Sequence, residues 1–273
     1  GICDSAAMVR TIIGIDPRNP EIWTTPNIAA ASDTDGDGAP ELVFSSENIE
    51  NGRAWLLDVG DASEAMVSTA TARVEAEGSG QGLGMSPVGG RDLDGDGAED
   101  LLLGGLDPDP GAFTNRGVVW VFHGPMTGEL DSSQADATWS GAEASALLGR
   151  QVRAHGDLDG DGTEDLLALL ENGAILEDDA EGPALLLLPG DATGAADAVD
   201  AALATIAMDV DGDGSSEGWV SQTDGTDATD LDGDGVTDLV LGLPYLGLAG
   251  GVGVHLGPIE GDRFELDLSA MAP

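Results

Sequence analysis

The sequence DLDGDGTED at residues 157–165, followed directly by LLALL at residues 166–170, decides the fold. An acidic loop that contains two glycines leads here into a continuous apolar run. The same arrangement occurs five times in the 273 residues of the chain. The other four copies begin at Asp33, Asp92, Asp209 and Asp230. A chain that repeats one loop and one apolar run in this way is predicted to consist of repeated structural units.

Every copy of the loop has acidic residues at positions 1, 3, 5 and 9 and glycines at positions 4 and 6. A hard cation such as Ca²⁺ takes about six to eight oxygen ligands. Four carboxylates and the backbone carbonyl of position 7 supply most of them, and glycine permits the left-handed backbone that folds a loop around an ion. The plain alternative is a set of Asp-Gly hairpin turns. Such a turn does not require acids at the same four positions five times over.

The loops therefore predict up to five bound Ca²⁺ ions. An EF-hand is excluded because it requires Glu at position 12, where this chain has Phe44, Leu103, Ala168, Val220 and Leu241. The apolar residues at that position predict a buried strand after each loop. The predicted metal ligands are Asp33, Asp35, Asp37, Ala39, Glu41, Asp92, Asp94, Asp96, Ala98, Asp100, Asp157, Asp159, Asp161, Thr163, Asp165, Asp209, Asp211, Asp213, Ser215, Glu217, Asp230, Asp232, Asp234, Val236 and Asp238.

A second repeated element, a glycine followed by an apolar run, occurs after each main loop. Its leading glycines are Gly52, Gly117, Gly182 and Gly251, which are separated by 65, 65 and 69 residues. This period divides the chain into repeats of one array. The predicted units are approximately 1–60, 61–125, 126–190 and 191–258, with a terminal strand within 259–273.

One unit, residues 61–125, shows the strands that we expect in each. Residues 67–74 alternate and are rich in β-branched residues, which is typical of an outer strand. Short strands are expected at 85–90, 101–103 and 118–122. Four short strands in about 65 residues correspond to one propeller blade. We therefore predict an all-β fold, a β-propeller of about four four-stranded blades. The spare strand at 259–273 either completes the first blade or opens a fifth.

These motifs resemble the FG-GAP repeat of integrin α-subunit propellers and bacterial integrin-like proteins. The resemblance is carried best by residues 228–258, with ATDLDGDG at 228–235, DLVLGLP at 238–244 and GVGV at 251–254. It implies a β-propeller with Ca²⁺ held between the first two strands of a blade, used for adhesion or ligand binding. The chain departs from the family in having Leu-Gly at 83–84 and 148–149 where the family has Phe-Gly.

The charge of the chain excludes several classes of partner. The formal net charge is −43, and the nine basic residues are all arginine. Nucleic acids and anionic membrane surfaces attract positive proteins, so neither is an expected partner. No apolar run reaches the ~18 residues of a membrane helix. Calcium loops of moderate affinity are filled where calcium is plentiful, which favours an extracellular or cell-surface location.

We expect a protein without enzymatic activity. The three histidines, His123, His155 and His255, lie in different repeat contexts, and no hydrolase or metalloprotease motif is present. The first functional hypothesis is an adhesion propeller that binds a protein on a cell surface or matrix. The second is a lectin-like propeller that binds a glycan through Trp23, Trp139 or Trp219, with Trp55 and Trp120 buried. The third is an accessory module of a larger secreted enzyme. The alternating segment 264–268 also predicts self-assembly through an edge strand.

Overall fold

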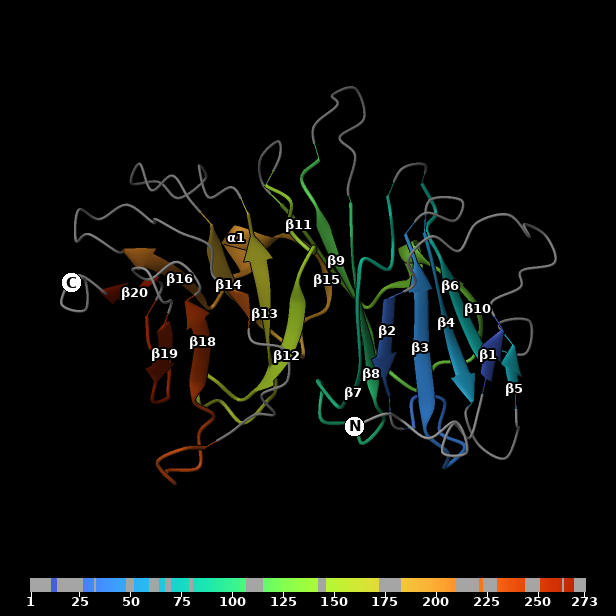
Figure 1. Ribbon diagram of the computed structural model, residues 1–273, viewed down its shortest axis with the longest axis horizontal. Helices are drawn as coiled ribbons and strands as arrows, with labels where there is room; N and C mark the ends of the chain where they lie inside the picture. Colours follow the sequence, from blue (N-terminus) through green and yellow to red (C-terminus); the bar gives the residue numbers. More distant parts are fainter. Residues whose placement is uncertain are drawn as a thin grey trace, which may run out of the picture.

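The computed structural model shows a chain that is almost entirely β in the part it describes (Figure 1), which confirms the predicted all-β class. Within the described ranges, two short helices interrupt the strands: α1 (Ala198–Ala201) and the 3₁₀-helix η3 (Ser132–Gln134). Among the described residues, no helix has the length and apolar character needed to cross a membrane. The structure describes residues 11–13, 27–31, 33–47, 52–58, 64–66, 70–78, 81–106, 115–141, 146–171, 183–209, 221–222, 230–243, 251–261 and 263–267.

Three sheets share one strand order. The first sheet consists, in order, of β2 (Asn27–Ala30), β3 (Glu41–Ser46), β4 (Arg53–Asp58), β6 (Ala72–Glu75) and β10 (Gly128–Asp131). The second sheet consists of β7 (Ser86–Arg91), β8 (Asp100–Gly105), β9 (Val118–Phe122), β11 (Ala137–Ser140) and β15 (Gly194–Asp197). The third sheet consists of β12 (Val152–Gly156), β13 (Asp165–Leu170), β14 (Ala184–Pro189), β16 (Ala204–Asp209) and β20 (Arg263–Asp267).

The pairing within these sheets follows one scheme. The first four strands are antiparallel to their neighbours, and the fifth strand is parallel to the fourth. In sequence, β10 follows β9 of the second sheet, yet it pairs with β6 of the first sheet. Each complete sheet thus combines three strands of one unit with outer strands from later in the chain. The unit boundaries near residues 60, 125 and 190 therefore fall within sheets, and the parallel fifth strand was not foreseen from the sequence.

Two smaller sheets lie at the two ends of the row of sheets in Figure 1. The fourth sheet consists of β17 (Ser221–Gln222), β18 (Leu239–Leu243) and β19 (Gly251–His255), all antiparallel. The two-stranded sheet at the opposite end pairs β1 (Thr11–Ile13) with β5 (Glu64–Met66) in parallel.

The core lies between successive sheets, because buried strands send alternate side chains to opposite neighbours. On β13, Leu166 and Ala168 pack against the second sheet, whereas Leu167 and Leu169 pack in the cluster that contains Leu239 of the fourth sheet. Every residue of β13 is buried. A strand that is covered on both faces needs no polar alternate residues, which explains the continuous apolar runs after the acidic loops.

The leading glycine of the second repeated element joins adjacent units. Gly117 forms an isolated parallel bridge with Leu148, and Gly52 forms the same bridge with Leu83. At Gly117, where φ is 79°, a Cβ atom would lie 2.0 Å from the carbonyl oxygen of Leu148. Only glycine fits this conformation and this close approach. The Leu-Gly element and the leading glycine, two separate features of the sequence, therefore form a single contact between units.

The spare strand of the sequence corresponds to β20, and both predicted places for it, in the first blade or in a fifth, were wrong. It pairs in parallel with β16, with Ile206 opposite Phe264. This position is the outer edge of the third sheet, so β20 occupies the place that β10 has in the first sheet and β15 has in the second.

Candidate metal centres

The acidic loops occupy equivalent places in the fold. The loops at 33–41, 92–100 and 157–165 each connect the first strand of a complete sheet to its second strand. The loop at 230–238 precedes β18, which is the second strand of the fourth sheet. In all four described loops the glycines at positions 4 and 6 have positive φ values between 75° and 96°. The predicted left-handed glycine positions are therefore confirmed in these loops.

The first acid of each loop holds the loop closed. Oδ2 of Asp33 accepts a hydrogen bond from the backbone N–H of Gly38 at 3.0 Å. The same bond joins positions 1 and 6 of the other described loops, with lengths of 3.0, 3.0 and 2.9 Å. One oxygen of the first carboxylate is thus used within each loop. The other oxygen has no hydrogen-bond partner in Asp33 and Asp92, whereas in Asp157 and Asp230 it also accepts a backbone N–H of the loop.

The acids at positions 3 and 5 bind the loop backbone in the same manner. Oδ1 of Asp35 accepts the N–H of Asp37 at 3.0 Å, and Oδ1 of Asp37 accepts the N–H of Ala39 at 2.8 Å. The equivalent bonds occur in the other three described loops. In the third loop, the hydroxyl of Thr163 also donates to Asp161 at 2.6 Å, which lowers the pKa of Asp161. Each acid is oriented by its own loop, so the arrangement is set by local sequence.

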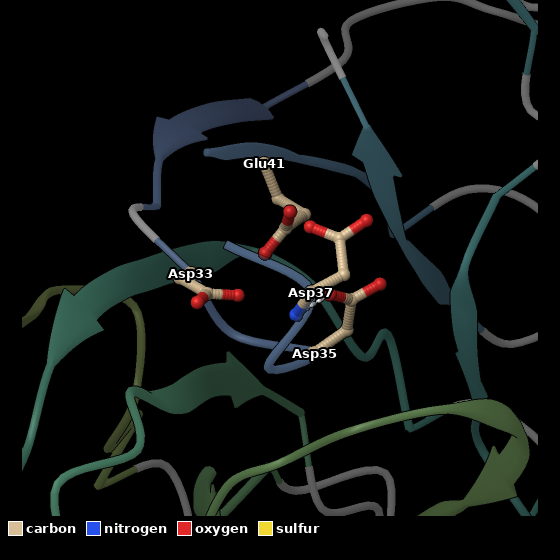
Figure 2. Close-up of side chains that lie close together, drawn as sticks. All are labelled: Asp33, Asp35, Asp37 and Glu41. Carbon is tan, nitrogen blue, oxygen red and sulfur yellow. Dashed lines mark hydrogen bonds between the residues drawn. The ribbon is translucent and has the colours of Figure 1, made fainter. Parts of the chain in front are cut away.

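Three or four carboxylates of each described loop converge on a common point, whereas the predicted ligands Asp100, Asp161 and Asp238 do not join these groups. In the first loop, Asp33, Asp35, Asp37 and Glu41 each place one oxygen so that all four atoms lie within 4.8 Å of one another. Figure 2 shows these four side chains gathered around the turn between β2 and β3. The same criterion groups three acids in each of the other loops, namely Asp92, Asp94 and Asp96; Asp157, Asp159 and Asp165; and Asp230, Asp232 and Asp234.

The acid at position 9 has a role that the sequence did not indicate. One of its oxygens accepts the backbone N–H of position 2 in every described loop, as in the 2.6 Å bond from Leu93 to Asp100. In the second loop, the other oxygen of Asp100 accepts the N–H of Gly124 at 2.8 Å, and Gly257 donates in the same way to Asp238. Both oxygens are then occupied, which explains why Asp100 and Asp238 are absent from the converging groups.

The third loop differs at this position. The N–H of Gly190, which is equivalent to Gly124, donates to the carbonyl of Glu164 at 3.1 Å and not to Asp165. Asp165 therefore keeps one oxygen free for the centre of its loop. A glycine directly after the third strand is the sequence signal for this contact, but the sequence does not show which acceptor the glycine selects.

Several carboxylate oxygens in these centres are buried without a hydrogen-bond partner. They are Asp33 Oδ1, Glu41 Oε1, Asp92 Oδ1 and Asp165 Oδ1. An unsatisfied buried acceptor costs about 1–3 kcal/mol, and more when it is charged. These four atoms lie in three loops, and a cation bound in each of these loops would satisfy the atoms of that loop.

Burial also changes the protonation of these centres. Burial raises the pKa of Glu41 and that of Asp165 to about 7, although both accept backbone hydrogen bonds that act in the opposite direction. Burial likewise raises the pKa of Asp100 and of Asp159. A buried carboxylate without an opposite charge either takes up a proton or requires a cation.

Part of the predicted ligand set lies outside the described residues. Asp209 ends strand β16, but the other predicted ligands of its loop, Asp211, Asp213, Ser215 and Glu217, cannot be placed. The position-7 carbonyls of Ala39, Ala98, Thr163 and Val236 remain predicted ligands.

The histidines and tryptophans are placed as follows. His155 is buried, and its pKa is lowered by burial and by the nearby Arg91 and Arg153. His123 approaches the second loop, with Nδ1 at 3.6 Å from Oδ2 of Asp94. Trp55 and Trp120 are buried, as predicted. Trp139 is buried as well, so its expected exposure was wrong, whereas Trp23 and Trp219 lie outside the described residues.

Neither a protein-family model nor a curated protein matches this chain.

Proposed function

We propose that this protein is a calcium-binding β-propeller of the FG-GAP type, without enzymatic activity, that serves in adhesion or protein–protein interaction outside the cell. The observation that carries the proposal is the convergence of oriented carboxylates in four equivalent loops, each at the same place relative to its sheet. Buried, unpartnered oxygens in three of these loops support a cation as the missing partner.

Ca²⁺ suits the donor set better than other common metals. All the side-chain donors are carboxylate oxygens, with no histidine or cysteine among the converging groups. Oxygen-only donors favour Ca²⁺ or Mg²⁺ over Zn²⁺ or copper. A flexible loop that offers three or four carboxylates and a backbone carbonyl fits Ca²⁺, because Mg²⁺ usually keeps several waters and demands strict octahedral geometry.

The proposed role of the ion is structural. Each loop connects the first strand of its sheet to the second. In the second sheet, the acid at position 9 also links the loop to the turn after the third strand. When bound, the ion would supply the positive charge that lets these carboxylates stay ionised together. Binding to the native state alone adds to the free energy of unfolding.

The packing of the sheets supports the propeller. Successive four-stranded meanders lie face to face, with an acidic loop at the same strand connection in each. This arrangement is typical of blades that follow one another around an axis. The burial of Trp139 weakens the glycan-binding hypothesis, because sugar sites usually present aromatic faces. Adhesion is therefore the preferred function.

The proposal is tested by thermal unfolding of the wild-type protein with Ca²⁺ and with a chelator, each at low and high NaCl. We expect a large rise in Tm that is specific to Ca²⁺. The matched variants are Asp35→Asn, within the first centre, and Glu260→Gln, an exposed acid outside the loops. Only Asp35→Asn should reduce the rise. If NaCl reproduces the rise, or if both variants reduce it equally, the calcium sites are refuted.

The adhesive role needs a separate experiment. The calcium-loaded protein is immobilised and tested against extracellular matrix proteins and against a glycan array. Calcium-dependent binding to a protein supports the proposal. Binding to glycans alone would favour the lectin-like alternative.

A further inference from the structure

The fourth sheet and the two-stranded sheet are complementary parts of one complete sheet. A complete sheet has three antiparallel strands of one unit, then an antiparallel fourth strand and a parallel fifth. The fourth sheet has only the first three of these among the described residues, and it ends at β19. The β1–β5 sheet has only a parallel pair. Its strand β5 lies between β4 and β6 in sequence, as β10 lies between β9 and β11, so β5 is the equivalent of a fifth strand.

Side-chain exposure shows that the fourth sheet lacks a neighbour. Val252 and Val254 of β19 occupy the same positions as Val119 and Val121 of β9 in the second sheet. In both sheets, these residues lie opposite corresponding residues of the sheet's second strand. The residues of the second sheet are fully buried, whereas Val252 is 62% exposed and Val254 is 50% exposed. Apolar residues in a position that the rest of the molecule covers completely mark a surface that binds a partner.

The opposite end of the row has one exposed apolar residue on the outer face of the first sheet. Ile28 lies opposite Phe44, and Phe44 lies opposite Trp55, so the three form one row across the first sheet. Phe44 and Trp55 belong to a cluster separate from the core shared with the second sheet. Ile28 is 57% exposed. Phe44 and Trp55 are already buried in this cluster, so Ile28 is the exposed residue of the row.

We propose that the β1–β5 sheet of a second copy of this chain completes the fourth sheet by pairing β1 with β19, in a head-to-tail assembly. In the structure these strands belong to sheets at opposite ends of the row (Figure 1), so the partner strand comes from another copy. The same docking brings the exposed Ile28 of one copy towards Val252 and Val254 of the next. The proposal rests on the strand order and not on the calcium sites.

The register of the junction follows from the complete sheets. Trp120 lies opposite Thr138 and Val119 lies opposite Trp139. The sequence ATW at 137–139 and ATI at 204–206 align with RTI at 10–12. Ile12 of one copy is therefore placed opposite Val252 of the next. Directly opposed residues of antiparallel strands are close enough for a disulfide.

The test is disulfide trapping in a Cys3→Ser background. The variant Ile12→Cys/Val252→Cys is oxidised in Ca²⁺ and high salt, where screening reduces repulsion between chains of net charge −43. We expect most of the protein to become covalent dimers and larger species. The control Thr11→Cys/Val252→Cys should not cross-link, because adjacent residues of a strand point to opposite faces.

Two outcomes overturn the proposal. A disulfide that forms within single chains would show that the ring closes intramolecularly. The absence of any cross-link, in protein that still unfolds cooperatively, would show that β1 does not reach β19 at all. The failure of calcium binding would appear separately, in the Tm measurements on the wild-type protein.

A second measurement does not depend on cysteine chemistry. Val254→Asp adds a charge to the proposed junction, whereas Leu256→Asp adds the same charge at an exposed residue just after β19. Both residues are exposed, so the monomer should fold in each case. Sedimentation velocity should show association of the wild type and of Leu256→Asp, with loss of association in Val254→Asp. Equal behaviour of the two variants would contradict the proposed junction.

Discussion

Asp165 accepts a hydrogen bond from the backbone N–H of Leu158 at 2.8 Å through Oδ2, while its Oδ1 atom is buried without a partner. The first contact orders the loop, and the second atom is available to a cation. Asp165→Asn should therefore act in two directions. In Ca²⁺ the variant should lose about 1.4 kcal/mol of calcium-binding free energy, equivalent to a tenfold weaker affinity. The Ca²⁺-induced rise in Tm should therefore be smaller than in the wild type.

In a chelator at pH 8, the same variant should be at least as stable as the wild type, because it removes a charge that burial disfavours. Thermal unfolding under both conditions measures the two effects. A variant that is less stable in the chelator by as much as it is in Ca²⁺ would show that Asp165 has only a structural role.

The ion-free protein should become less stable as the pH rises. Burial raises the pKa of Glu41 and of Asp165 to about 7, so the native state holds these protons to a higher pH than the unfolded chain does. Their stabilisation is complete below about pH 4 and is lost as the pH rises through about 7. Urea unfolding in a chelator at about pH 5, 6, 7 and 8 measures the slope of the free energy of unfolding against pH.

Calcium should abolish this slope, because the cation replaces the protons. Other carboxylates titrate in the opposite direction, as Asp161 does with its lowered pKa. The double variant Glu41→Gln/Asp165→Asn therefore serves as the reference, and the difference between the variant and the wild type isolates the two groups. An unchanged difference across this range of pH would contradict the assigned pKa values.

The packing between the third and fourth sheets should be essential for stability. Leu167 and Leu239 are fully buried in one cluster, with 0% and 1% of their surfaces exposed. Leu167→Ala should lower the free energy of unfolding by about 2–5 kcal/mol. The control Leu256→Ala, at a side chain that is 48% exposed, should change it by less than about 0.5 kcal/mol. Equal losses in urea unfolding would contradict the predicted sheet contact.

The contact between Gly117 and Leu148 should tolerate no side chain. Gly117→Ala meets the carbonyl oxygen of Leu148 and requires a positive φ, so it should cost several kcal/mol. Gly128→Ala is the matched control, since Gly128 also has a positive φ but nothing lies within 4 Å of an added Cβ atom. Its cost should be about 1 kcal/mol. Comparison of the two variants in urea unfolding separates the cost of the steric clash from the cost of the positive φ.

The sequence indicated the elements that depend on local chemistry. In the four described loops, the left-handed glycines and the convergence of the acids follow from contacts within about ten residues, such as that between Asp33 and Gly38. The strand 118–122 was predicted with its observed bounds, because its short length and its β-branched and aromatic residues favour a buried strand over a helix.

The sequence could not predict the elements that depend on distant contacts. The fifth strand β10 has the sequence GELD, which carries no strand signal of its own. The occupation of both oxygens of Asp100 depends on Gly124, which is 24 residues away. Trp139 shares the alternating pattern of an outer strand, and its burial results from the sheet that packs upon it. These features depend on the neighbouring unit and not on the local segment.

The fifth strand has a consequence for how such a chain can evolve. Because β10 comes directly after β9 of the second sheet in the chain and pairs with β6 of the first sheet, the strand that finishes each complete sheet follows the third strand of the next sheet. Duplication or deletion of one whole repeat in the gene would leave every internal sheet complete. The number of repeats can then change without the invention of a new contact, and only the two end sheets need any adjustment.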